Sequence, residues 1–289
     1  MRILILGGDG MLGHQLLTSW QGNHEVSVTL RGDAQRYADY GLFTSENSFY
    51  GVDVLDFSSV EQVVRIFRPE AIVNAIGIVK QRAEAHDTIL SLEVNSLLPH
   101  RLSQLCKKVG ARLIHLSTDC VFSGDRGMYT ESDLEDARDL YGRSKLMGEV
   151  HDAHAVTLRT SIIGLELSRN KSLIEWFLAQ SGQVKGFTRA IYSGFTTREM
   201  ARIIEHVLLD YRSISGLWHV ASAPISKYAL LAELSGLMKR SDIELLPEND
   251  FFCERSLDAT RFNTETGYQP PSWHDMLKEL AADIRERDT

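Results

Sequence analysis

The chain has 289 residues, which is enough for one large domain or for two domains joined closely. Its 31 basic residues against 39 acidic ones give a net charge of −8, and without a basic stripe this balance disfavours nucleic acid as a partner. No apolar run approaches the roughly 20 residues that cross a bilayer, so we expect no membrane association and a cytoplasmic protein. The three cysteines, Cys106, Cys120 and Cys253, are odd in number and far apart, which argues against a disulfide framework.

A glycine-rich turn follows the first predicted strand. The apolar run at 2–6 leads directly into three glycines, and an apolar helical pattern begins among them. A glycine backbone turns tightly and can approach a pyrophosphate, while the start of a helix offers free N–H groups. The spacing is Gly-x-x-Gly-x-x-Gly, and its strand-to-helix context favours a dinucleotide-binding turn over a plain turn. The residues predicted to contact the cofactor here are Gly7, Gly10, Met11, Leu12 and Gly13.

Strands and helices alternate along the first part of the chain, which is typical of an α/β fold with a doubly wound parallel sheet. Further strands are predicted at 25–30, 71–75, 112–116 and 156–159, together with a short third strand that ends at 52–54, and helices are predicted at 58–67 and through 97–105. Beyond Thr160 the spacing becomes less regular, with helices predicted at 198–209, 227–238 and 273–285 and a strand at 217–220. We therefore expect an NAD(P)-binding domain over 1–160 and mainly a smaller substrate-binding cap over 161–289, with 196–221 returning to the sheet.

Tyr141 and Lys145 stand four residues apart at the start of a predicted helix, so their side chains share one face. A cation held beside a phenol stabilises the phenolate, which suits the phenol to general acid catalysis near neutral pH. Such a pair can protonate the oxygen of a ketone as a hydride arrives. The same spacing occurs on many solvated helices, so its weight comes from the glycine turn and from the motif described next.

A polar motif ends the predicted strand 112–116, at the edge of a parallel sheet that faces the ligand crevice. It reads Ser117-Thr118-Asp119-Cys120-Val121-Phe122. With the Tyr-Gly-x-Ser-Lys run and the N-terminal glycines, it resembles the extended short-chain dehydrogenase/reductases, and among them the dTDP-4-dehydrorhamnose reductase group. The resemblance implies a Rossmann-type sheet with a cap, and Thr118 as the hydroxyl that binds the substrate carbonyl. It also implies Tyr141 as the proton donor and Lys145 as the cation that holds the nicotinamide ribose. Ser117 is the alternative hydroxyl, and motif register favours Thr118.

The choice of nicotinamide depends on the end of the second predicted strand. Arg31 stands there, and a guanidinium suits the 2′-phosphate of NADP(H). Asp33 lies nearby and keeps NAD(H) open, because a carboxylate accepts from a ribose 2′-hydroxyl. The other predicted cofactor contacts are Asp53 and Val54 after the third strand, and Ala75, Ile76 and Gly77 after the fourth.

The predicted substrate contacts are Thr118, Cys120, Arg189, Tyr192 and Arg255. Arg255 lies in a segment that resembles the place where relatives hold an arginine, and a guanidinium fork matches a diphosphate. Two features depart from the reductase group: Cys120 replaces its usual tyrosine, and the 77–84 loop carries Lys80, Gln81 and Arg82. The nucleotide and the sugar therefore stay open between dTDP-linked and UDP-linked forms.

The resemblance implies an NAD(P)H-dependent reductase of the 4-keto group of a nucleotide-activated 6-deoxy sugar, serving cell-surface polysaccharide biosynthesis. An NAD-retaining epimerase or dehydratase shares the Tyr/Lys pair and is the second interpretation. A third is a non-catalytic NADP-binding regulatory subunit, against which the intact Thr118, Tyr141 and Lys145 count. The expected partner is a nucleotide sugar, a homodimer is one assembly open to the chain, and the histidines show no spacing that predicts a metal site.

Overall fold

The computed structural model describes residues 1–79, 86–168 and 171–287, and this part of the chain divides into two compact units. The first unit comprises Met1–Ser117, Asp139–Leu158 and Ala201–Leu217. The second comprises Thr118–Arg138, Arg159–Met200 and the chain from Trp218 onward. Each unit is thus assembled from separate stretches of sequence. The predicted assignment of 1–160 to cofactor and 161–289 mainly to substrate stays a prediction about function.

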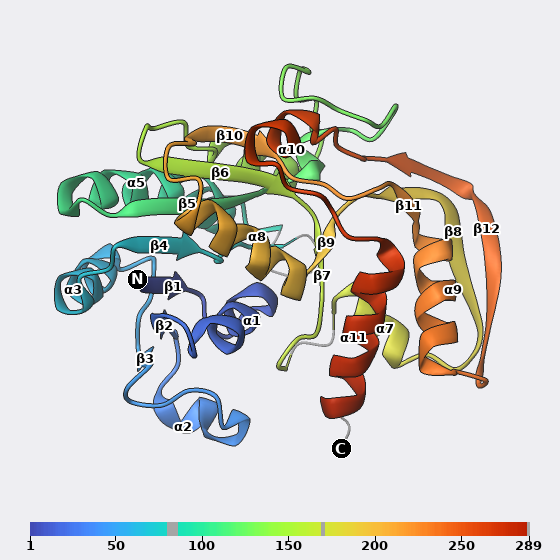
Figure 1. The fold of residues 1–289 in the computed structure, drawn as a ribbon, viewed down its shortest axis with the longest axis horizontal. Helices are drawn as coiled ribbons and strands as arrows, with labels where there is room; N and C mark the ends of the chain where they lie inside the picture. Colours follow the sequence, from blue (N-terminus) through green and yellow to red (C-terminus); the bar gives the residue numbers. More distant parts are fainter. Residues whose placement is uncertain (80–85, 169–170, 288–289) are drawn as a thin grey trace. The chain divides into compact units, whose positions relative to one another are not determined.

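The main sheet has seven strands in the order β10-β6-β5-β4-β1-β2-β3 (Figure 1). The pairs β1–β2, β1–β4, β2–β3 and β4–β5 are parallel, and the helices that alternate with these strands make the crossovers that parallel pairing requires. The predicted α/β fold is therefore confirmed. The strands are β1 (Arg2–Leu6), β2 (Glu25–Thr29), β3 (Ser48–Phe49), β4 (Ala71–Asn74), β5 (Arg112–Thr118), β6 (Ala155–Thr160) and β10 (Gly216–His219).

Helices cover the sheet because each presents one apolar stripe. Along α3, the valines at 60, 63 and 64 recur at helical spacing and are buried. They join a cluster with Leu102 of α5 and with Leu4 and Ile72 of the strands, so α3 and α5 cover one face of the sheet. The helices of this part are α1 (Met11–Trp20), α2 (Ala34–Tyr37), η1 (Ala38–Tyr40), α3 (Phe57–Phe67), α4 (Thr88–Ser91), the π-helical η3 (Leu92–Leu97), α5 (Leu98–Val109), α6 (Leu140–Met147) and α8 (Thr197–Leu209).

The third strand lies earlier in the chain than the sequence predicts. It is Ser48–Phe49, and the predicted strand 52–54 is a turn instead. Gly51 has φ +70°, which bends the chain out of the sheet directly after the strand. Asp53 then accepts a hydrogen bond from the Leu55 N–H at 3.0 Å, which is the local turn that aspartate favours. A short apolar run therefore predicts a strand wrongly when turn-forming residues, here Gly51 and Asp53, lie beside or within it.

The second unit contains a three-stranded sheet in the order β11-β8-β12 and a two-stranded sheet of β7 and β9. Strand β12 pairs parallel with β8, and the predicted helices of this part are present as α9 and α11. The elements are η4 (Asp119–Val121), β7 (Ile162–Ile163), α7 (Leu173–Leu178), β8 (Gly182–Tyr192), β9 (Phe195–Thr196), β11 (Ile225–Ser226), α9 (Lys227–Met238), β12 (Ile243–Glu254), α10 (Thr260–Thr266) and α11 (Trp273–Arg287).

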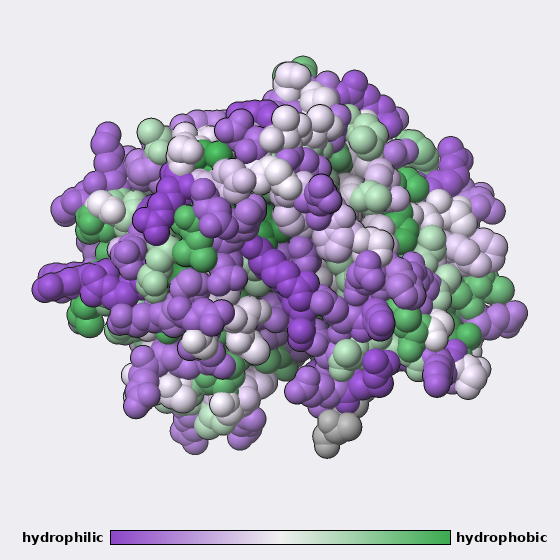
Figure 2. Space-filling model, in the orientation of Figure 1, coloured by the Kyte–Doolittle hydropathy of each residue, from purple (hydrophilic) through white to green (hydrophobic). Residues whose placement is uncertain are grey.

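The surface is mixed in character. On the face shown in Figure 2, hydrophobic residues occur in small groups among hydrophilic ones. Among the helices of residues 1–79, 86–168 and 171–287, none combines the length and the apolar character that a membrane span requires.

Helix α6 approaches the π-helical turn η3 more closely than a side chain would permit. A Cβ added to Gly148, the residue that ends α6, would lie 1.9 Å from the carbonyl oxygen of Asn95. Both backbones would have to move to accept it, because real Cβ atoms do not come within 3.0 Å of another heavy atom. Glycine at position 148 therefore fixes how near α6 lies to η3.

Replacing Gly148 by alanine is expected to lower the free energy of unfolding by about 3 kcal/mol, the upper part of the range for overpacked sites. Gly236 is the matched control, because it lies within α9 and an added Cβ meets nothing within 4 Å. Gly236→Ala is expected to raise stability by about 0.5 kcal/mol through helix propensity. Urea unfolding of both variants measures the difference, and equal midpoints would contradict the packing argument.

Candidate active site

The glycine turn after β1 has the backbone that a pyrophosphate site requires. Gly7 has φ +84°, and a Cβ there would lie 2.7 Å from the side chain of Ile76. A Cβ on Gly13 would lie 2.0 Å from the Gly7 carbonyl oxygen, so helix α1 packs directly onto the turn. Gly10 is the N-cap of α1 and supplies no side-chain cap, which leaves the first N–H groups of the helix for a ligand. Leu12 is buried in the core, so only its backbone can take part.

The loop after β2 is tied to this turn by a tyrosine. The Tyr37 hydroxyl accepts from the Gly32 N–H at 3.2 Å and donates to an Asp9 carboxylate oxygen at 3.4 Å. Arg31 is exposed in that loop, whereas the Asp33 carboxylate caps α2 by accepting from the Arg36 N–H at 3.1 Å. The structure thus places Arg31 in a loop that is bonded to the glycine turn, and it gives the Asp33 carboxylate a structural partner.

The segment after β4 also reaches the glycine turn. The Asn74 side chain accepts from the Ile76 N–H at 3.2 Å, which holds Ile76 against Gly7. A Cβ on Gly10 would lie 3.9 Å from the Ala75 carbonyl oxygen, so Ala75 is part of the same wall. Of the other predicted cofactor contacts, Gly77 lies next to Asn95, while Asp53 and Val54 belong to the turn after β3. The motif departures at Lys80, Gln81 and Arg82 lie outside the described residues.

Lys145 belongs to α6, and its buried ammonium lies at the end of β5. Its side chain is 5% exposed, and its ammonium donates to the Leu116 carbonyl oxygen at 2.5 Å. Burial lowers the pKa of Lys145 to about 8, and the nearby Glu149 carboxylate opposes that shift. Glu149 is itself buried and accepts from the Ser117 hydroxyl at 2.6 Å. Glu149 was not predicted as a site residue, and its place four residues after Lys145 was the available signal.

A neutral histidine lies in the same region. His115 of β5 is fully buried, and burial, then the positive charge of Lys145, holds its pKa well below the usual value. Its Nδ1 lies 3.2 Å from the side-chain nitrogen of Asn74, so Nδ1 accepts that N–H and Nε2 carries the proton. His115 therefore adds no second positive charge near the Lys145 ammonium.

Asn95 connects the helix of the Tyr/Lys pair to the loop after β4. Its side chain accepts from the Ile78 N–H at 2.9 Å, and it donates to the Ile78 carbonyl at 3.0 Å and to the Ser144 hydroxyl at 3.1 Å. Ser96 donates to the Ser144 carbonyl at 2.7 Å. The π-helical turn points these two side chains at α6, and π-turns within helices often occur at functional sites. The sequence predicted one continuous helix here and missed both residues.

Thr118 ends β5 and lies in the second unit. Its hydroxyl accepts from the Cys120 N–H at 3.1 Å and donates to the Asp119 carboxylate at 3.2 Å. The alternative hydroxyl, Ser117, donates to Glu149 at 2.6 Å, and the choice of Thr118 over Ser117 stays a prediction. The convergence of Thr118 with Tyr141 and Lys145 on one substrate stays a prediction.

Two of the predicted substrate contacts meet within the second unit. The Arg255 guanidinium donates to the Phe122 carbonyl at 2.8 Å and the Ser123 carbonyl at 3.2 Å, and it reaches the Cys120 sulfur at 3.6 Å. Burial raises the pKa of the Cys120 thiol to about 12, with Asp119 adding to the shift, so Cys120 is unsuited to act as a nucleophile. Arg255 is thus oriented by the loop that follows Thr118.

The other two predicted substrate contacts differ in exposure. Tyr192 is buried, and its hydroxyl has no hydrogen-bond partner among the described residues. Burial and the charge of Asp119 raise its pKa well above the usual value, which places the phenol within electrostatic reach of the Thr118–Asp119 segment. Arg189 is exposed, and its guanidinium lies 5.0 Å from the ring centre of Phe252. The charge of Asp119 therefore acts on Tyr192, whereas Arg189 contacts Phe252 of β12.

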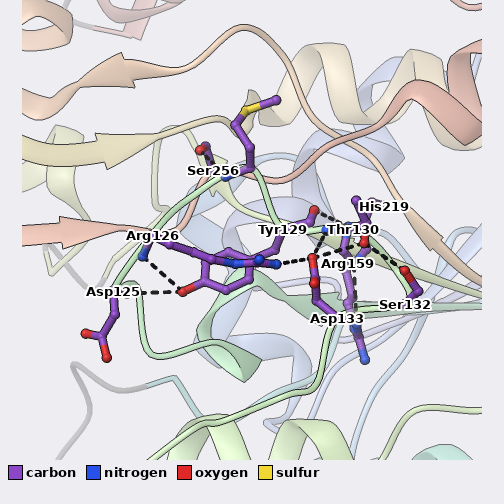
Figure 3. A network of polar contacts seen from close by, with 10 residues as sticks. Asp125, Arg126, Tyr129, Thr130, Ser132, Asp133, Arg159, His219 and Ser256 are labelled. Carbon is purple, nitrogen blue, oxygen red and sulfur yellow. Dashed lines mark hydrogen bonds and ion pairs between the residues drawn. The ribbon is translucent and has the colours of Figure 1, made fainter.

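A buried arginine organises the segment that follows this motif (Figure 3). Arg159 is 1% exposed, pairs with Glu135 and donates to His219 Nε2 at 3.3 Å. His219 in turn donates from Nδ1 to the Tyr129 carbonyl at 3.0 Å, and the Tyr129 ring stacks on Phe122 with centres 4.2 Å apart. Residues 119–138 are therefore held to the second unit by one charge network, which fixes the loop that carries Cys120.

Comparison with protein families places nearly the whole chain in one of them. The model of the RmlD substrate binding domain matches residues 1–286. The chain belongs to this family. In fold it resembles a dTDP-4-dehydrorhamnose reductase from Bacillus anthracis, solved in complex with NADP, with a TM-score of 0.78 and 22% identity over 98% of this chain and 99% of that one.

Two named relatives of this RmlD-family chain point to different activities. A methionine adenosyltransferase 2 subunit beta from Danio rerio is 24% identical over 261 residues, which are 85% of this chain and 76% of the relative. A dTDP-4-dehydrorhamnose reductase from Streptomyces griseus is 32% identical over 149 residues, which are 51% of this chain and 43% of the relative. The second match spans less than half of the relative's length.

The pKa of Lys145 should depend on Glu149. Because the carboxylate stabilises the ammonium, Glu149→Gln is expected to lower that pKa further below about 8. Glu61→Gln, an exposed position on α3, is the control and should leave it unchanged. NMR titration of a lysine-labelled sample measures the value. A lysine resonance that titrates as in a free peptide, in both variants, would contradict the burial of this cation.

Proposed function

We propose that the chain is an NADPH-dependent reductase of the 4-keto group of a nucleotide-activated 6-deoxy sugar. The observation that carries the proposal is the buried Lys145 ammonium, one helical turn after Tyr141 and at the carboxyl end of β5. Ligands of open α/β sheets bind at that edge. The glycine turn ends β1 at the same edge, because β1, β4 and β5 run parallel. Family membership and the reductases among the relatives support the same assignment.

Four side chains of the protein have a role in this proposal. The chemistry that a bound reduced nicotinamide supplies is hydride transfer. Tyr141 gives a proton to the carbonyl oxygen of the sugar, and Lys145 stabilises the negative charge left on the phenol. Thr118 orients the carbonyl through its hydroxyl. Glu149 acts through Lys145 and is a positioning residue, because its carboxylate raises the pKa of Lys145 and so helps to keep the ammonium protonated at neutral pH.

NADP(H) is the proposed cofactor, with the pyrophosphate at Gly7, Gly10 and Gly13. The backbone fits this group, because Gly7 takes the positive φ that the tight turn needs and Gly10 begins α1 without a side-chain cap. Arg31 is exposed in the loop bonded to the glycine turn, so its guanidinium can take the 2′-phosphate, whereas Asp33 caps a helix. A solved structural relative is described in complex with NADP, which supports this choice.

The proposed substrate surface lies in the second unit, at Cys120, Tyr192 and Arg255. The Tyr192 hydroxyl is buried without a partner among the described residues, and a sugar hydroxyl could satisfy it. Arg255 is oriented by two carbonyls of the loop after Thr118, and a guanidinium fork matches a diphosphate in charge and geometry. A nucleotide sugar is therefore the proposed substrate class.

A second candidate function is that of a regulatory subunit without turnover. The observation that favours it is the match to methionine adenosyltransferase 2 subunit beta, which extends over 85% of this chain. Retention of Thr118, Tyr141 and Lys145 favours the reductase. Turnover separates the two functions, because a regulatory subunit binds the dinucleotide and does not consume it.

Tyr141→Phe tests the reductase directly. With dTDP- and UDP-linked 4-keto-6-deoxy sugars, NADPH oxidation followed by nicotinamide absorbance should fall by about a hundredfold or more, the usual contribution of a general acid. NADPH affinity should stay nearly unchanged, because the phenol oxygen is a reaction group. Tyr40→Phe on η1 is the control and should keep full activity. Tight NADPH binding without oxidation by any sugar in the panel would favour the regulatory subunit.

Arg31→Ala tests the cofactor. Loss of the guanidinium should raise the KM for NADPH about tenfold or more and leave the KM for NADH little changed, since only the former carries the 2′-phosphate. Arg36→Ala, a neighbouring exposed arginine on α2, controls for the general loss of a positive charge. Equal effects of Arg31→Ala on both cofactors would remove this residue from the choice between them.

A further inference from the structure

A cavity of about 540 Å³ lies at the amino ends of the strands in the first unit, and we call it the arginine cavity. Arg2 is the first residue of β1 and Arg112 the first of β5, and both line it. The ends of α3, α5 and α8 supply the rest of the wall. The five arginines that line it are Arg2, Arg65, Arg68, Arg112 and Arg212.

Positive charge in this cavity is not neutralised by the protein. Glu70 is the one acidic residue among the described residues that line it. Its carboxylate accepts from the backbone N–H of Arg2 at 2.7 Å. In the part of the chain that the structure describes, the side chains of Arg2, Arg65, Arg68 and Arg212 form no ion pair. This concentration of cations stands out in a chain of net charge −8.

Helix ends account for part of this charge. Arg112 donates to the carbonyls of Val207 at 2.8 Å, Tyr211 at 2.9 Å and Ile214 at 2.8 Å, so it caps the end of α8. A helix carboxyl end carries about half a negative charge. Against five arginines, three such ends and one carboxylate still leave roughly two and a half positive charges uncompensated by that measure. Burial and then the like charge of Arg212 lower the pKa of Arg112.

We propose that the arginine cavity binds a small phosphorylated anion, separate from the dinucleotide. Guanidinium groups match phosphate oxygens in charge and in fork geometry. The volume falls within the range of small-molecule sites, about 300–1,000 Å³. The cavity lies at the amino end of β1 and the glycine turn at its carboxyl end. One five-residue strand, roughly 16 Å at strand rise, therefore separates the two.

Pyrophosphate binding to the full-length chain, measured by titration calorimetry, tests the proposal. The double variant Arg65→Gln/Arg212→Gln removes two exposed arginines and leaves the structural contacts of Arg112 in place. It is expected to weaken pyrophosphate binding at least about tenfold, as two charge-assisted contacts are lost. Lys278→Gln/Arg285→Gln, two exposed cations of α11, removes the same charge elsewhere and should leave the affinity within about twofold.

Glu70→Gln gives a change of the opposite sign. Without the carboxylate, pyrophosphate should bind several-fold more tightly, while the amide oxygen can still accept from the Arg2 N–H. Unchanged affinity in both cavity variants would overturn the proposal, since the anion would then occupy the glycine turn alone. A poly-glutamate peptide that binds through Arg65 and Arg212 where pyrophosphate does not would also overturn it, in favour of a protein partner.

Discussion

The burial of one ammonium group is the constraint on which the candidate site depends. Moving a charge out of water costs several kcal/mol unless other groups compensate for it. For Lys145 the compensation is partial. The Leu116 carbonyl accepts a hydrogen bond from the ammonium and the Glu149 carboxylate lies nearby, yet the pKa of Lys145 still falls to about 8. With a pKa of about 8 the ammonium is still mostly protonated at neutral pH, so its positive charge can stabilise a phenolate during proton transfer. His115, held neutral beneath the same strand end, adds no competing charge.

Two parts of the candidate site rest on close approaches of backbone to backbone. At the glycine turn, a Cβ on Gly13 would collide with the Gly7 carbonyl, and at the end of α6 a Cβ on Gly148 would collide with that of Asn95. The second approach brings Ser144 within hydrogen-bonding distance of the Asn95 side chain, at 3.1 Å. The helix that carries the Tyr/Lys pair is thereby locked to the loop after β4. Because these glycines have no side chain, the two backbones can come close enough for polar groups such as Ser144 and Asn95 to meet in a fixed geometry.

The sequence predicts local features well where a single physical rule decides them. The apolar run at 71–75 is a central strand, and the helices predicted at 227–238 and 273–285 are present as α9 and α11. The strand predicted at 52–54 is wrong, because turn chemistry around Gly51 outweighs a short apolar run. The helix through 97–105 is present as α5, but a π-helical turn at Leu92–Leu97 precedes it, and periodicity alone does not distinguish a π-turn from an α-helix. Asn95 went unnoticed for that reason.

By itself the sequence determined the alternation of strands and helices in the first part of the chain, the glycine turn and the four-residue spacing of Tyr141 and Lys145, because each follows from residues that are neighbours in the chain. Only the tertiary structure decided that Lys145 is buried, that Ser117 is bonded to Glu149, and that arginines from strand starts and helix ends share one cavity. These features depend on parallel strand pairing, which places residues far apart in sequence at the same edge of a sheet. Burial and electrostatic coupling arise from that placement, and no local pattern encodes it.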